Sequence, residues 1–132
     1  MTAARSLRRP ALFVAGCLAL PLAGCLEPEV DRIEDPVEKA AYHCRYVVER
    51  AIATPDQLRA DGVLRDRIAD FAEPEVERTG EVVRFTWAPG AITGKDGSGA
   101  HGGDCVMDIT GGQQLVVSAS LDGQPLHAGF RF

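Results

Sequence analysis

The chain of 132 residues has no hydrophobic run long enough to cross a lipid bilayer. Its longest apolar stretch, residues 11–24, has about 14 residues, whereas a transmembrane helix needs roughly 20. Three arginines precede that stretch, at Arg5, Arg8 and Arg9. A basic segment followed by a short apolar one is typical of a secretory signal, so residues 1–24 are predicted to be a signal peptide.

Positive charge is scarce in the rest of the chain. Removing residues 1–24 takes away three arginines and no acid, which leaves 11 basic and 19 acidic residues, a net charge of −8. Nucleic acids and anionic lipid headgroups attract basic surfaces, so this acidity argues against both as partners. About 108 residues remain, which is enough for one domain with one core.

Cysteine is also sparse. Cys17 falls within the signal and Cys25 follows it directly, so only Cys44 and Cys105 remain as a pair. In the oxidising compartment that a signal peptide implies, such a pair forms a disulfide by default. Two free thiols or half of a metal site are the alternatives, but a separation of 61 positions lacks the close spacing of zinc ligands. No metal and no cofactor is expected.

The end of the apolar stretch, Leu22-Ala23-Gly24-Cys25, resembles the lipobox of bacterial lipoproteins. The resemblance implies lipid on the Cys25 thiol and cleavage before it, and two or more acyl chains hold a protein stably at a membrane. Leu26 stands where some lipoproteins of enterobacteria carry an Asp that keeps them on the inner membrane, so the outer membrane is the expected location. Residues 25–35, which are acidic and contain Pro28, are predicted to be an extended linker to a single domain, residues 36–132.

A helix is predicted from Pro36 to about Ala53. Asp35 stands where an N-cap belongs, Pro36 suits the first helical position, and apolar residues then recur with helical spacing over four turns. Thr54-Pro55 interrupts this pattern. A second short turn directly after the interruption, and another short helix within residues 63–72, are both compatible with the sequence.

After Pro74 the apolar residues recur with period two, which is typical of strands. Strands are predicted at residues 75–78, 81–88, 105–109 and 114–121. The predicted fold class is α+β, with one main N-terminal helix packed on one face of a three- to four-stranded antiparallel sheet. Cys44 and Cys105 both fall on apolar faces, so their disulfide would pin the helix to the sheet.

The glycine-rich residues 88–104 are predicted to form a loop, although they lack the spacing of a phosphate-binding loop. Asp96, Ser98 and Asp104 carry the oxygen ligands that calcium prefers and are candidate ligands, but a mobile hairpin connection is the simpler interpretation. Ser98, His101 and Asp104 are residue types that hydrolases use. A flexible glycine-rich loop would not hold them in place, so no catalytic site is predicted.

Aromatic side chains suggest a partner surface in two parts of the chain. Two tyrosines lie one helical turn apart beside the apolar stripe of the predicted helix. The C-terminal residues 127–132 alternate like a strand, and they could add to a partner's sheet edge or pack on their own domain. The candidate partner surface consists of Tyr42, Tyr46, Phe130, Arg131 and Phe132.

The order of the predicted elements, with Cys44, the Thr54-Pro55 break and the DCVMD segment at residues 104–108, resembles a group of small bacterial secreted and lipoprotein domains of unknown function. The resemblance implies a fold and no activity. The sequence therefore favours a non-enzymatic lipoprotein of the cell envelope that binds a protein partner or acts as an accessory module at the membrane. The alternative is a periplasmic binder of a small ligand or ion that uses residues 88–104.

Overall fold

The computed structural model describes residues 27–132, which divide into two units. The first unit ends at Glu34 and contains a 3-10 helix, η1 (Glu27–Arg32), where the sequence predicted an extended linker. The second unit, residues 35–132, contains the helix and the sheet. The predicted signal peptide and Cys25 lie outside the described residues. Within the described part, no helix is long and apolar enough to cross a membrane.

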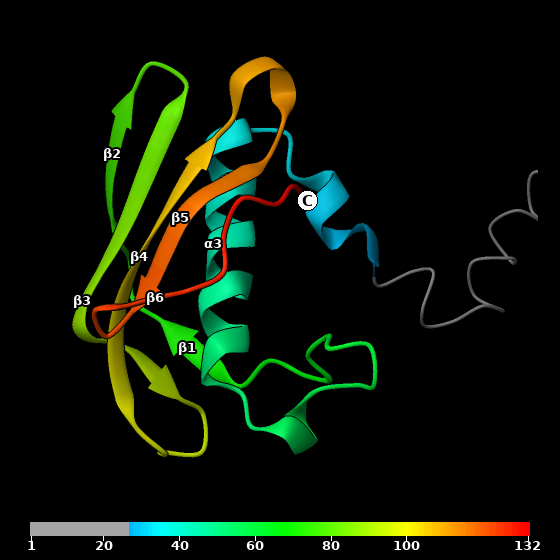
Figure 1. Cartoon of the computed structure of the whole chain (residues 1–132), viewed down its shortest axis with the longest axis vertical. Coiled ribbons are helices and arrows are strands. Elements are labelled where there is room, and N and C mark those ends of the chain that lie inside the picture. Colours follow the sequence, from blue (N-terminus) through cyan, green and yellow to red (C-terminus); the bar gives the residue numbers. More distant parts are fainter. Residues whose placement is uncertain (1–26) are drawn as a thin grey trace, which may run out of the picture. The chain divides into compact units, whose positions relative to one another are not determined.

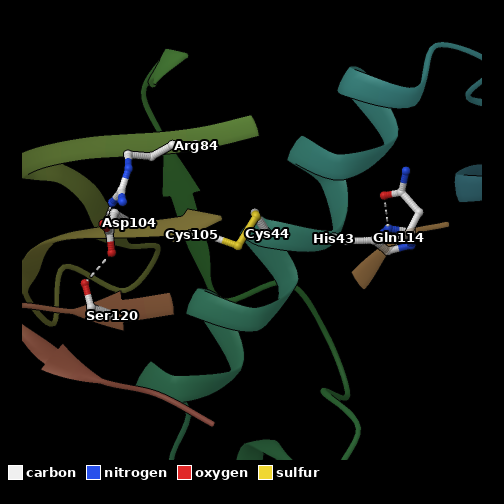
Figure 2. Close-up of a disulfide and its surroundings, with 7 residues drawn as sticks. All are labelled: His43, Cys44, Arg84, Asp104, Cys105, Gln114 and Ser120. Atoms are coloured by element: carbon white, nitrogen blue, oxygen red, sulfur yellow. Dashed lines mark hydrogen bonds and ion pairs between the residues drawn. A yellow bond between two sulfur atoms is a disulfide. The ribbon is translucent and has the colours of Figure 1, made fainter. Parts of the chain in front are cut away.

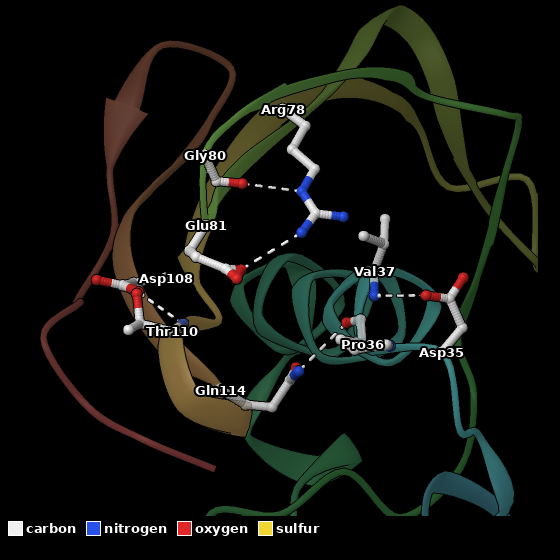
Figure 3. A network of polar contacts seen from close by, with 9 residues as sticks. All are labelled: Asp35, Pro36, Val37, Arg78, Gly80, Glu81, Asp108, Thr110 and Gln114. Atoms are coloured by element: carbon white, nitrogen blue, oxygen red, sulfur yellow. Dashed lines mark hydrogen bonds and ion pairs between the residues drawn. The ribbon is translucent and has the colours of Figure 1, made fainter.

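The predicted main helix is confirmed as α3 (Pro36–Ile52). Its N-terminus is capped by Asp35, whose carboxylate accepts a hydrogen bond from the Val37 amide at 3.1 Å (Figure 3). Pro36 at the first helical position lacks the amide that would have no partner there. The helix ends before Thr54-Pro55, as the sequence predicted.

The sheet has six antiparallel strands rather than the predicted three to four (Figure 1). Their order is β1-β3-β4-β5-β6, and β2 pairs with the other half of β3. The added strands are short: β1 arises within the segment that could have been helical, and β6 has two residues. The strands are β1 (Ala69–Phe71), β2 (Glu75–Thr79), β3 (Val82–Gly94), β4 (Ala100–Asp108), β5 (Leu115–Leu121) and β6 (Gln124–Pro125).

The prediction that residues 88–104 form a loop was wrong, because most of them lie in the long β3–β4 hairpin. Only residues 95–99 form the turn. Two glycines are needed here for close approach of neighbouring backbone. A Cβ added to Gly102 would lie 2.9 Å from the Pro89 nitrogen, and one added to Gly103 would lie 2.6 Å from the Ser120 carbonyl oxygen.

Helix α3 packs on one face of the sheet, chiefly against β4 and β5. Cys44 on the helix and Cys105 on β4 are both fully buried, and their sulfur atoms form the predicted disulfide (Figure 2). The largest fully buried side chains of the core are Trp87, Phe85 and Ile92. The disulfide thus joins the two layers at the centre of the core, as the positions of the cysteines on the two apolar faces predicted.

Between α3 and β1 the chain forms irregular structure with one short 3-10 helix, η2 (Pro55–Gln57), so the second turn is shorter than predicted and residues 63–72 contain β1 instead of a helix. Glu49 of α3 anchors this segment. This residue is 1% exposed, and its carboxylate accepts hydrogen bonds from the amides of Ile68, at 2.5 Å, and Ala69, at 3.0 Å. Arg67 also donates to it, at 3.0 Å.

The C-terminal segment, residues 126–132, lies along the free edge of β5 and crosses beside α3 (Figure 1). Leu126 donates to the carbonyl of Ala119 at 2.9 Å, and Gly129 to that of Val116 at 2.7 Å. The amide of Phe132 donates to the carbonyl of Gln114 at 3.0 Å. The strand-like alternation of the segment is therefore used within the chain, which is the second of the two arrangements that the sequence left open.

Candidate functional site

An aromatic groove lies between α3 and the C-terminal segment. It encloses about 340 Å³ and is open to solvent. The helix supplies one wall and the C-terminal segment supplies the other. The groove is lined by Tyr46, Val47, Arg50, Ala51, Leu126, His127, Phe130 and Phe132.

Ring contacts hold the C-terminal wall of the groove in place. Phe132 stacks on His43 with 4.1 Å between ring centroids and meets the edge of Tyr46 at 6.2 Å. Phe130 stacks on His127 at 5.3 Å and contacts Phe132 edge-on at 5.5 Å. Such pairs add about 0.5–1.5 kcal/mol each beyond burial of area. The side chain of Phe132 nevertheless stays 48% exposed, so it presents an aromatic surface to solvent.

The ring of Phe132 stacks on one member of a buried polar pair, His43 and Gln114. His43 Nδ1 lies 2.9 Å from the side-chain oxygen of Gln114, whose amide nitrogen donates to the Pro36 carbonyl at 3.2 Å (Figures 2 and 3). Burial is the main cause that lowers the pKa of His43, and the nearby charge of Lys39 acts in the same direction. A neutral imidazole beneath Phe132 is therefore favoured at neutral pH.

The structure brings together three residues of the predicted partner surface, Tyr46, Phe130 and Phe132, in the aromatic groove. Tyr42 lies outside it and contacts the ring of His43 edge-on. Arg131 also lies outside the groove, where its Nε donates to the side chain of Gln113 at 3.2 Å. The sequence could have indicated Arg50, which follows Tyr46 by one helical turn, whereas nothing in the local pattern indicated Leu126 or His127.

A second, smaller cavity lies on the other side of Tyr46 and encloses about 30 Å³. It is lined by Tyr42, Arg45, Tyr46, Glu49 and Arg67. Because Tyr46 lines both hollows, they are neighbours on the exposed side of α3.

The candidate calcium ligands are spread along the β3–β4 hairpin. Asp96 lies in the turn and accepts a hydrogen bond from the Ser98 amide at 2.8 Å. Asp104 lies on β4, roughly 13 Å along the strand from its first residue, and binds Arg84 and Ser120 (Figure 2). Among residues 27–132, no group of three or more His, Cys, Asp or Glu side chains is arranged to hold a metal ion.

His101 pairs with Asp122 rather than with Ser98 or Asp104. Its Nδ1 lies 2.7 Å from Asp122 Oδ2, and the Gly102 amide donates to the other carboxylate oxygen at 3.0 Å. The hydrogen bond from His101 is the main cause that lowers the pKa of Asp122. The pair joins the start of β4 to the turn after β5, so it stabilises the sheet.

Comparison with protein-family models, with curated proteins and with solved structures finds no match for this chain. The features of this chain that indicate a function are the groove, the cavity beside it and the N-terminal motif.

Proposed function

We propose that this protein is a non-enzymatic lipoprotein of the cell envelope that binds a partner protein in the aromatic groove. The lipid on Cys25 would hold it at a membrane, more specifically the outer membrane, and residues 35–132 would present the groove to the partner. The N-terminal motif supports the anchor, because a basic segment, a short apolar segment and Leu-Ala-Gly-Cys follow one another in that order.

The observation that carries the binding proposal is the exposed aromatic surface around the groove. Half-buried Tyr46 and exposed Phe132 line it, and Arg50, which also lines it, is exposed. Tyrosine and arginine are enriched among the residues that dominate binding energy at protein interfaces, and an apolar hollow bordered by them suits an inserted side chain. The proposed occupant is an aliphatic or aromatic side chain of the partner protein.

The groove is better suited to this role than residues 88–104, on which the alternative depended. Most of those residues form regular strands, Asp104 is engaged by Arg84 and Ser120 within the sheet, and Asp96 accepts a hydrogen bond from the Ser98 amide in the turn. A ligand would have to break those contacts. In the groove, by contrast, apolar surface is already open to solvent.

Photo-crosslinking in intact source cells tests this function. Tyr46 is replaced by p-benzoylphenylalanine, which keeps an aromatic ring at that position. The matched control carries the same group at Thr79, which is exposed on β2 and lies outside the groove. One discrete crosslinked protein at position 46 that is absent at position 79 is expected. Equal crosslinking at both positions, or none at either, contradicts partner binding in the groove.

A further inference from the structure

The small cavity beside Tyr46 contains more positive charge than its one carboxylate balances. Arg45 comes from α3, and Arg67 comes from the segment before β1. Glu49 lies between them in the chain order and is the only acidic residue among the described residues that line the cavity. Two guanidinium groups therefore share the cavity with a single carboxylate.

The hydrogen bonds of that carboxylate are made with residues other than Arg45. Glu49 Oε1 accepts from Arg67 Nε, and Glu49 Oε2 accepts from the amides of Ile68 and Ala69. Its hydrogen bonds are thus made to the segment before β1 and the start of that strand. A carboxylate has about four acceptor positions, and these contacts use most of them.

Arg45 makes no hydrogen bond or ion pair with any residue of the described part, 27–132. It is partly buried nonetheless. Burial first, and then the charge of Arg67, lowers the pKa of Arg45, while the charges of Glu73, Tyr42 and Glu49 act in the opposite direction. A partly buried guanidinium beside a second one is a favourable place for an anion, because desolvated charges need partners.

We propose that Arg45 and Arg67 bind a carboxylate of the partner protein, next to the apolar side chain that enters the groove. This inference rests on the proposed function. The cavity, of about 30 Å³, has room for only a small group, such as the planar end of an Asp or Glu side chain or a chain terminus. Arginine binds carboxylates through two parallel hydrogen bonds, which gives the contact direction as well as energy.

A carboxylate site at Arg45 and Arg67 would make this surface selective for one kind of partner segment. The mature chain is acidic overall, so an acidic partner would be repelled from most of it and attracted only near Arg45 and Arg67. A partner segment with an apolar residue and a nearby carboxylate would occupy both the aromatic groove and the small cavity, because Tyr46 borders each of them.

Acetate is the probe for the carboxylate site. It is added to purified residues 25–132, and its binding is monitored through the NMR signals of the arginine side chains and of the α3 amides. Saturable shifts at Arg45 and Arg67 are expected with acetate and not with chloride at the same ionic strength. Arg45→Gln should weaken acetate binding about tenfold, since a charge-assisted pair is lost. Because Arg45 has no protein partner among the described residues, this variant should keep its fold, and its amide spectrum verifies that.

Arg65→Gln is the matched control, because Arg65 is exposed and lies outside the cavity. It should bind acetate as the unmodified protein does. Identical shifts with acetate and chloride, or equal affinity in Arg45→Gln, would overturn the carboxylate site.

A second probe separates this inference from the proposed function. N-acetylphenylalaninamide is apolar and uncharged, so it tests the groove alone and should shift the amides of Val47 and Ala51. If it does so while acetate has no effect, the carboxylate site is wrong and the groove stands. If acetate binds and N-acetylphenylalaninamide does not, the cavity binds anions but the proposed function of the groove is wrong.

Discussion

His43 and Phe132 form a stacked ring pair, with their planes 8° apart, that joins the middle of α3 to the end of the chain. The contact fixes the C-terminal wall of the aromatic groove. Below it, the hydrogen bond between His43 and Gln114 ties the same imidazole to the start of β5. The groove is therefore a product of tertiary packing, since its two walls come from opposite ends of the domain.

Loss of the disulfide should strongly destabilise the domain. On the chain-entropy model, closing a loop of 61 residues stabilises the fold by about 4 kcal/mol. We predict that Cys105→Ser lowers the melting temperature by well over 10 °C, since about 1 kcal/mol corresponds to roughly 4–8 °C in a domain of this size. Thermal unfolding followed by circular dichroism measures the shift. Reduction of the unmodified protein should give a similar loss, and an unchanged melting curve in both cases contradicts the role of the disulfide.

Replacing Glu49 should loosen the segment before β1. Glu49→Ala removes a buried acceptor from two backbone amides and one guanidinium, so we expect a loss of about 2–4 kcal/mol in the free energy of unfolding. Urea denaturation measures the loss, and hydrogen exchange should accelerate at Ile68 and Ala69 first. Glu38→Gln, on an exposed part of the same helix, should change stability by less than about 0.5 kcal/mol. Equal effects of the two variants would refute the anchoring role.

The burial of His43 predicts a loss of stability at acidic pH. Because the folded-state pKa is lowered, the unfolded state binds more protons as the pH falls below the ordinary value of 6.5. Stability should therefore be greatest above pH 6.5 and should decline from there down through the folded-state pKa. Urea denaturation at pH 7.5 and pH 5.5 measures the difference. His43→Gln, which cannot titrate, should show a smaller decline, and the same decline in both proteins would contradict the assignment to His43.

The stacked pair predicts that stability depends on an aromatic ring at position 132. Phe132→Ala removes the contacts with His43, Tyr46 and Phe130, and we expect a loss of about 1–2 kcal/mol in the free energy of unfolding. Phe132→Tyr keeps the ring and should be nearly neutral, because this side chain is half-exposed. Chemical denaturation compares the two. If the alanine variant is as stable as the tyrosine variant, the C-terminal wall does not depend on this stack.

Local signals predicted the helix and the disulfide well. Asp35 and Pro36 specify the start of α3 within a few residues, and the positions of Cys44 and Cys105 on two apolar faces specified their pairing. The glycine-rich segment misled the prediction because glycine is common both in loops and where backbones approach closely. Gly102 and Gly103 serve the second purpose, which only the neighbouring strands reveal.

The candidate site was only partly predictable for a related reason. Tyr46, Phe130 and Phe132 could be singled out as aromatic residues beside a helix stripe and in a strand-like tail. Their assembly into one groove depends on the hydrogen bonds of residues 126–132 with β5, which are tertiary and leave no mark in the local pattern. The charge excess at Arg45 likewise appears only when Glu49 is seen to bind the segment before β1 instead.

The most direct test of partner binding in the aromatic groove is the Tyr46 crosslink, measured in two further variants. Ala51→Glu places a charge in the apolar groove at an exposed helix position, so the fold should persist while the partner's apolar side chain is excluded. Ala88→Glu makes the same change at an exposed position of β3 outside the groove. We predict that the crosslinked partner disappears in Ala51→Glu and remains in Ala88→Glu. An undiminished crosslink in Ala51→Glu would contradict it.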